Sequence, residues 1–151
     1  MATAQPRVAD VDRAYLIKDA QGSLYDQATA NLAANRARSD ALHRYGIQLI
    51  GDHARLNQIL TTLARSKGVA LPVTLTDTDQ TQLVQLSRTD ASKFDQAIIA
   101  EFVRINADDV RDGEKELRAT RDPQVRRAVA QFVRTERKHL REARTLQARL
   151  G

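Results

Sequence analysis

Hydrophobic residues recur at steps of three and four along most of this chain, which is the spacing of one face of an α-helix. The first such run extends from about residue 11 to 34, and the second from about 39 to 67. Two further runs, from about 90 to 119 and from 122 to 150, have the same spacing. The sequence therefore predicts four long amphipathic helices.

Each predicted helix has a stripe of residues that we expect to face the core. In the first run these residues are Val11, Ala14, Ile17, Gln21, Leu24, Ala28 and Leu32. In the second they are Leu42, Tyr45, Leu49, His53, Leu56, Leu60 and Leu63. In the third they are Phe94, Ile98, Phe102, Ile105, Asn106, Val110 and Leu117, and in the fourth Val125, Val129, Phe132, Glu136, His139, Leu140, Ala143, Leu146 and Leu150.

Capping residues mark the ends of these helices. Gly68 favours a left-handed cap after the second helix, and Asp122-Pro123 places a cap before a proline at the first helical position. Asp77 and Gln80 resemble a capping box, which would open a short helix through about residue 86. Two short connections and one long one predict an all-α, ferritin-like antiparallel four-helix bundle, with a long crossover and a short extra helix between helices two and three.

The composition agrees with one small helical domain. The chain has 151 residues, six glycines and three prolines, which is too few turn-forming residues for an all-β domain. We expect a disordered N-terminal segment over residues 1–10 and a bundle domain over 11–151. The absence of cysteine excludes disulfides and thiolate chemistry, and no apolar run approaches the roughly 20 residues that span a bilayer.

Positive charge gathers on the last predicted helix. The formal net charge is +5, and the basic residues of this helix include Arg127, Arg134, Lys138 and Arg141. This side could dock on an anionic surface or on nucleic acid, although no aromatic residues alternate with the arginines to stack bases, so no specific nucleic-acid partner is expected. The other interpretation is an ordinary solvated face. We likewise interpret the acidic run from residue 108 to 116 as a solvated face paired with arginines.

Polar residues interrupt the apolar stripes near the middle of three helices. His53, Asn106, Glu136 and His139 would lie at similar heights in an antiparallel bundle, and each has an energetic cost there unless it is paired. Glu136 and His139 have the spacing that places a carboxylate and an imidazole on one helix face. The chain has one such pair, with Ile50 standing three residues before His53, so a complete di-iron centre is not expected.

The sequence instead predicts one divalent transition metal, zinc or iron, held by His53, Glu136 and His139. Gln21, Asp52 and Asn106 would surround these ligands, with Asp52 orienting His53. The alternative is a buried hydrogen-bonded network that fixes the helix register. No phosphate-binding loop, dinucleotide fingerprint or serine-nucleophile motif is present, and no residue is assigned a catalytic role.

Several short stretches are similar to one bacterial family. They are Tyr15–Gly22, Leu49–His53 with Asn57 and Leu60, Gly68–Pro72, Phe94-Asp95 and Lys138–Leu140. Together they resemble domain-of-unknown-function family 4142 over nearly the whole chain. The resemblance implies a ferritin-like fold and an exported or outer-membrane-associated protein, and it implies no reaction. The family pattern favours glutamate near Asp26, an acidic residue near Ala28, histidine near Asn106 and proline near Arg134, so this chain lacks part of any ligand set that the family carries.

The sequence therefore predicts an exported bundle that acts as a periplasmic binding or stress-associated protein, with a reduced or vestigial metal site. The small polar start of the chain suits a mature protein whose signal peptide has been removed. Two alternatives stay open: a metal-dependent oxidoreductase of ferroxidase type, and a basic module that docks on an anionic surface. Enzymatic activity is the less favoured interpretation, and we expect a monomer or a weak dimer.

Overall fold

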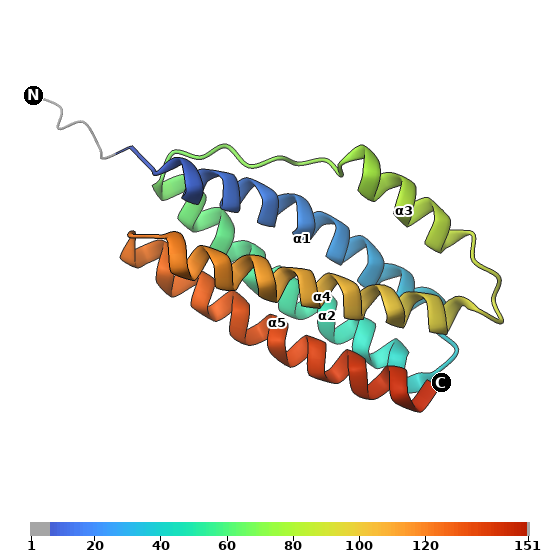
Figure 1. The fold of residues 1–151 in the computed structure, drawn as a ribbon. Helices are drawn as coiled ribbons and strands as arrows, with labels where there is room; N and C mark the ends of the chain where they lie inside the picture. The colour runs from blue at the N-terminus through green and yellow to red at the C-terminus, as the bar shows by residue number, and fades with distance from the viewer. Residues whose placement is uncertain (1–6, 151) are drawn as a thin grey trace, which may run out of the picture.

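The chain is all-α, as the sequence predicts. The computed structural model describes residues 7–150, which form five helices and no strand: α1 (Asp10–Arg36), α2 (Asp40–Ser66), α3 (Asp77–Ser87), α4 (Phe94–Ala119) and α5 (Pro123–Leu150) (Figure 1). The segment expected to be disordered lies outside the described residues as far as residue 6, and α1 already begins at Asp10. None of the described helices is both long enough and apolar enough to cross a bilayer.

The four long helices pack side by side as a bundle (Figure 1). α1 lies against α2 and α4, while α5 lies against α4 and α2, and neighbouring long helices run in opposite directions. The long connection after α2 carries the chain back along the bundle, with α3 packed on α1 and α4. The structure is thus a helical bundle with a short helix in its long connection, and its assignment as ferritin-like stays a prediction.

Helix ends follow the capping residues in most places. Gly68 has a φ of 66°, the left-handed conformation expected after α2. Asp122 Oδ1 accepts hydrogen bonds from the backbone N–H groups of Gln124 (2.8 Å) and Val125 (3.3 Å) at the start of α5. The capping box predicted at Asp77 is wrong: Thr76 caps α3, and its hydroxyl accepts from the N–H of Asp79 at 3.1 Å.

Two separate hydrophobic clusters form the core. One contains mainly the end of α1, the start of α2, the start of α4 and the end of α5, with Tyr45, Phe94 and Phe102 among its buried residues. The other contains mainly the opposite ends of the same helices, with Leu16, Leu60 and Val129. The middles of the four long helices lie between these clusters. Polar side chains in those middles are therefore enclosed by apolar layers on both sides.

The predicted inward face of α1 is wrong. Val11, the first residue of the expected stripe, is 45% exposed, and none of the other stripe residues is fully buried. The buried face of α1 instead contains Asp12, Leu16, Ala20, Ser23, Asp26, Thr29, Ala30 and Ala33, along with Tyr25. Half of this face is polar, so the stripe selected by hydrophobic periodicity lies on a partly exposed side of α1 instead of its core side.

α1 and α2 approach each other closely at Gly46. A Cβ atom at this position would lie 2.8 Å from Ala34 N and 3.0 Å from Ala30 O. Both are backbone atoms of α1, which cannot move aside as a side chain can. The small residues of α1 and the glycine of α2 therefore set the distance between the two helices.

Gly46→Ala is expected to destabilise the protein. Overpacking of this kind costs about 1–3 kcal/mol, which exceeds the roughly 0.5–1 kcal/mol that alanine gains over glycine inside a helix. Gly51→Ala, in the same helix with nothing within 4 Å of the added Cβ, is the control and should stabilise by about 0.5–1 kcal/mol. Urea unfolding measures both; equal stabilisation would contradict the close approach.

Candidate metal centre

A layer of ionisable side chains crosses the middle of the bundle. His53 comes from α2, while Glu136 and His139 come from α5, and their exposed fractions are 4%, 5% and 0%. One nitrogen or carboxylate oxygen from each of these three residues lies within 4.8 Å of the others. The structure thus brings together the three residues that the sequence predicts as metal ligands.

His139 lies between two carboxylates. Its Nε2 is 2.8 Å from Asp52 Oδ2, and its Nδ1 is 3.6 Å from Glu136 Oε2. Burial alone would lower the pKa of His139, but the nearby carboxylate of Glu136 and the hydrogen bond and charge of Asp52 outweigh burial and raise it. The expectation that Asp52 orients His53 is corrected here, because the side chain of Asp52 contacts His139 on the neighbouring helix.

Two atoms of this layer lack hydrogen-bond partners. Among the described residues, Glu136 Oε2 and His139 Nδ1 are buried and make no hydrogen bond. When the Nε2–H of His139 donates to Asp52, its Nδ1 presents a lone pair toward the carboxylate oxygen of Glu136. Two buried acceptors that face each other are unfavourable unless a positive group, either a proton or a metal ion, lies between them.

His53 completes this side of the layer. Burial lowers the pKa of His53, which favours the neutral imidazole that binds metals. Its Nδ1 lies 3.9 Å from Asp26 Oδ2, and its ring centre lies 5.6 Å from that of His139. The two imidazoles and Glu136 therefore form a compact group contributed by α2 and α5.

A carboxyl group occupies the other side of the layer on each of α1 and α4. Asp26 and Asp109, together with Glu136, also place one oxygen each within 4.8 Å of one another. Burial, and then the charges of neighbouring carboxylates, raise the pKa values of Asp26 and Asp109. A raised pKa favours the protonated carboxyl group. Asp109 is half-buried, and among the described residues it forms no ion pair with an arginine, unlike the arginine-paired residue that the sequence predicts.

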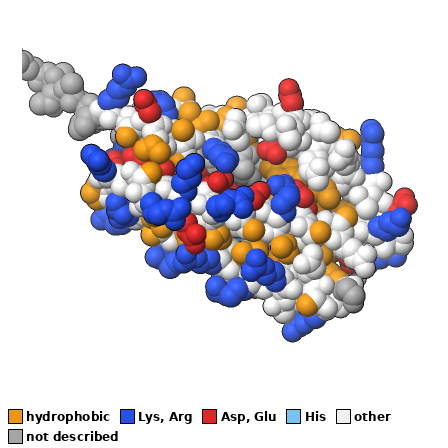
Figure 2. Space-filling view, viewed as in Figure 1, with side chains coloured by type: hydrophobic (Ala, Val, Ile, Leu, Met, Phe, Trp, Pro, Cys, Tyr) orange, Lys and Arg blue, Asp and Glu red, His pale blue; other side chains and the backbone are white. Residues whose placement is uncertain are grey.

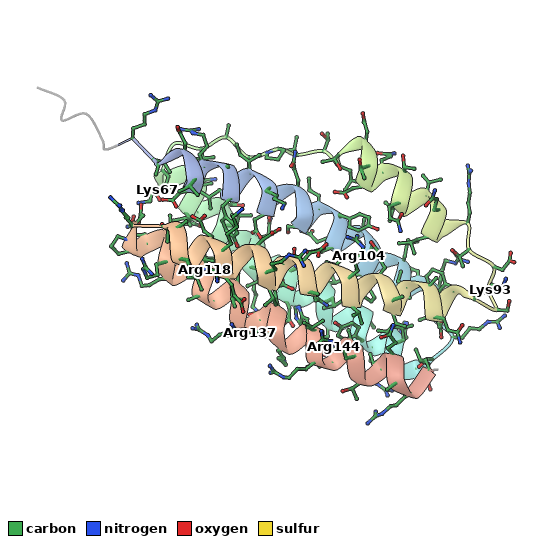
Figure 3. The ribbon with its side chains drawn as sticks, viewed as in Figure 1. Lys67, Lys93, Arg104, Arg118, Arg137 and Arg144 are labelled. Atoms are coloured by element: carbon green, nitrogen blue, oxygen red, sulfur yellow. The ribbon has the colours of Figure 1, made fainter. Side chains whose placement is uncertain are left out.

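A small cavity and a surface groove meet at this layer. The cavity, of about 20 Å³, is lined in part by Asp19, Asp26, His53 and Glu136. The groove, of about 330 Å³, is lined by residues of α1, α3 and α4, including Asp19, Asp26, Asp109 and Arg104. Figure 3 labels Arg104, on the α4 side of this groove. Acidic side chains show along this line on the surface, with lysines and arginines beside them (Figure 2). Asp19 and Asp26 line both spaces, so they separate the interior layer from solvent.

The residues expected around the ligands have different roles. Asn106 is buried, and its Nδ2 donates to Tyr45 Oη at 3.3 Å, while Tyr45 Oη donates to the backbone oxygen of His139 at 2.9 Å. This chain of bonds holds the α5 backbone behind His139. Gln21, by contrast, lines the surface groove and is absent from the residues that enclose the small cavity. It lies beside the layer and not in it.

The basic residues of α5 are exposed. Arg127, Arg134, Lys138 and Arg141 lie outside the core, on the helix whose surface carries many of the lysine and arginine side chains of this view (Figure 2). Lys138 lies 3.7 Å from Glu142 of its own helix. Docking of this face on an anionic surface stays a prediction.

Comparisons with known proteins identify a family and a fold. The family model described as "Domain of unknown function (DUF4142)" matches residues 1–146. A solved structure, described as "Crystal structure of DUF305 fragment from Deinococcus radiodurans", superposes with a TM-score of 0.84 at 12% identity and covers 95% of this chain and 99% of that chain. At this identity the likeness concerns the fold alone. No curated protein matches the sequence.

A second pair of buried carboxyl groups lies away from the layer. Asp12, near the start of α1, and Glu116, near the end of α4, are 2% and 3% exposed. Burial, followed by the neighbouring carboxyl group of Asp12, raises the pKa of Glu116 from 4.5 to about 8. The expectation that Glu116 belongs to a solvated acidic face is therefore wrong.

This pair predicts that stability falls as pH rises from about 4.5 to about 8. In that window the folded protein keeps the Glu116 proton while the unfolded chain loses it, so the unfolded state binds fewer protons and gains relative stability. The slope of the unfolding free energy against pH is set by the difference in bound protons between the folded and unfolded states. Glu116→Gln should reduce this difference by up to about one proton and so flatten the slope.

Glu114→Gln is the matched control, because Glu114 is a partly exposed residue of the same helix and pairs with Arg137. Urea unfolding at a series of pH values measures both variants. An unchanged pH slope in Glu116→Gln would contradict the raised pKa of Glu116.

Proposed function

Because this chain belongs to the DUF4142 family, whose function is not known, we propose a function from the geometry of its core: the protein binds a divalent transition-metal ion between His53, Glu136 and His139. One observation carries the proposal. Among the described residues, Glu136 Oε2 and His139 Nδ1 are buried without hydrogen-bond partners, and they face each other at 3.6 Å. A bound cation would satisfy both atoms at once.

The donor set suits zinc and other late first-row metals. Two imidazole nitrogens and a carboxylate oxygen are a common three-ligand set for such ions, and they leave a position for water or a substrate. Asp52 supports this assignment, because a carboxylate on the far nitrogen of a metal-bound histidine fixes its tautomer and orientation. His53 needs no deprotonation, since burial already favours its neutral form.

The spread of the donor atoms requires a small adjustment on binding. The three atoms lie within 4.8 Å of one another, whereas ligands bound to one zinc ion at about 2 Å can be at most about 4 Å apart. Side-chain rotations that close the group by less than about 1 Å are therefore sufficient. Without metal, the raised pKa of His139 lets an imidazolium supply the positive charge between Asp52 and Glu136.

We favour metal binding in the bundle core over redox catalysis as the function of this protein. The proposal agrees with a ferritin-like classification, which is supported by the four long helices and the connection that contains α3. An exported location and a stress-associated role follow from the family resemblance and belong to the same proposal. A ferroxidase-type oxidoreductase needs the same ligands, so metal binding comes first in either account.

Elemental analysis of tag-free, never-chelated protein, followed by calorimetric zinc titration, tests this function. We expect at least one tightly bound equivalent of metal. His53→Gln removes one ligand and should weaken zinc binding by at least about tenfold, the lower bound for losing even an outer partner of a metal ligand.

His43→Gln is the matched control, because His43 is an exposed residue of the same helix. It should bind zinc as the unmodified protein does. Equal affinities of the His53 and His43 variants, or no uptake of zinc, iron, copper or manganese by the unmodified protein, would contradict the proposal. Circular dichroism confirms that both variants are folded.

A further inference from the structure

The net positive charge of the protein resides on one helix. α5 contains eight of the 24 lysine and arginine residues of the chain but only two of its 19 aspartate and glutamate residues. The rest of the chain therefore has 16 basic and 17 acidic residues, so the formal net charge of +5 arises from α5 alone. The molecule thus has one strongly positive side and no net positive charge elsewhere.

Five of the basic residues form a row on the outer side of α5. Steps of three, four, seven and eight residues separate them, which places them on one face of a helix. They are Arg127, Arg134, Lys138, Arg141 and Arg149, all exposed, and we refer to them as the basic row. The buried side chains of Glu136 and Ala143 lie on the opposite face. At 1.5 Å per residue the basic row is about 33 Å long.

The charge of the basic row is largely uncompensated. Within residues 7–150, Arg127, Arg134 and Arg141 form no ion pair with an acidic side chain. Lys138 lies 3.7 Å from Glu142, and Glu136, the other acidic residue of α5, is buried. The positive charge of the row is therefore available to an external partner.

The basic side chains nearer to α4 differ from the row, because they contact the bundle itself. Arg137 pairs with Glu114 of α4, and Arg126 donates to the backbone oxygens of Leu117 and Thr120. These residues have a partner within the fold, whereas the row points away from it. Lysine and arginine side chains accordingly follow the outer edge of the molecule where α5 lies (Figures 1 and 2).

We propose that the basic row docks the protein on a lipid bilayer that carries anionic phosphate headgroups. Each lysine or arginine that comes within a Debye length of such a surface is attracted to it. Because the row lies on the outer side of an edge helix, its five side chains can meet a plane of headgroups together. The metal centre takes no part in this contact, since His53, Glu136 and His139 are buried in the interior.

The shape of the row favours a bilayer over duplex DNA. One turn of a DNA duplex is about 34–36 Å long, close to the roughly 33 Å of the row. Over that length each phosphate strand winds once around the duplex, so a straight row meets phosphates at a few places only. Base stacking adds nothing either, because the phenylalanine of α5, Phe132, is buried. A bilayer presents headgroups along the whole row.

A hollow between α2 and α5 adds a place for a lipid beside the row. It measures about 530 Å³, and its lining includes Ile59, Leu63, Ala128 and Arg127. None of the described residues that line it is acidic. A headgroup phosphate paired with Arg127 would therefore meet no repelling charge there, and apolar side chains would border it.

Vesicle flotation tests this proposal. We expect the unmodified protein to bind vesicles made of equal parts phosphatidylcholine and phosphatidylglycerol at about 0.1 M NaCl, but not vesicles of phosphatidylcholine alone. Binding should be lost at about 1 M NaCl, where the Debye length shrinks to about 3 Å. The triple variant Arg134→Gln, Lys138→Gln and Arg141→Gln should bind the anionic vesicles about a hundredfold more weakly.

The matched control is the triple variant Arg65→Gln, Arg88→Gln and Lys93→Gln, which removes the same charge from exposed residues outside α5. It should lose far less affinity, and urea unfolding verifies that both variants are folded. Equal losses in the two variants, no binding of anionic vesicles, or binding of duplex DNA without binding of vesicles would overturn the proposal. Because no readout involves a metal, this proposal and the proposed function can fail separately.

Discussion

Carboxyl groups in the middle of the bundle are the constraint on which the rest of the structure depends. Asp26 and Glu136 are buried between two apolar clusters and Asp109 is half-buried beside them. A buried, uncompensated carboxylate costs several kcal/mol. The raised pKa values of Asp26 and Asp109, which favour protonated carboxyl groups, and the imidazole of His139 supply part of the compensation. Glu136 Oε2 still has no hydrogen-bond partner among the described residues. This uncompensated oxygen is the basis of our proposal that the layer binds a metal ion.

The same layer also explains how the helices are aligned. The long helices contribute polar residues near their middles, and each half of the bundle has its own hydrophobic cluster, although α4 adds only the partly buried Leu117 to the second cluster. Sliding one helix by a turn would move its carboxyl or imidazole groups against leucine and phenylalanine side chains, which is unfavourable. A buried polar layer of this kind can fix helix register as well as bind a ligand, so the two interpretations made from the sequence are compatible.

Polar core residues can be predicted from the sequence where the rest of the core face of a helix is apolar. His53, Glu136 and His139 interrupt strongly apolar stripes on α2 and α5, so they are conspicuous as polar residues facing the core. α1 has a buried face that is itself polar, with Asp12, Asp26 and Thr29, so hydrophobic periodicity selects the wrong side. Asp109 is hidden in an acidic run whose member Asp108 pairs with arginines. The partner of Asp52 depends on how α2 packs against α5, which no local pattern contains.

The most direct test of this account is the position of a metal ion in the folded protein. Crystals soaked in zinc and measured at the zinc absorption edge would locate the ion by its anomalous scattering. We expect a peak at about 2.0–2.2 Å from a nitrogen of His53, a nitrogen of His139 and an oxygen of Glu136. Zinc bound elsewhere, with His139 still bridging Asp52 and Glu136 through its own protons, would contradict the account and leave the layer as a purely structural network.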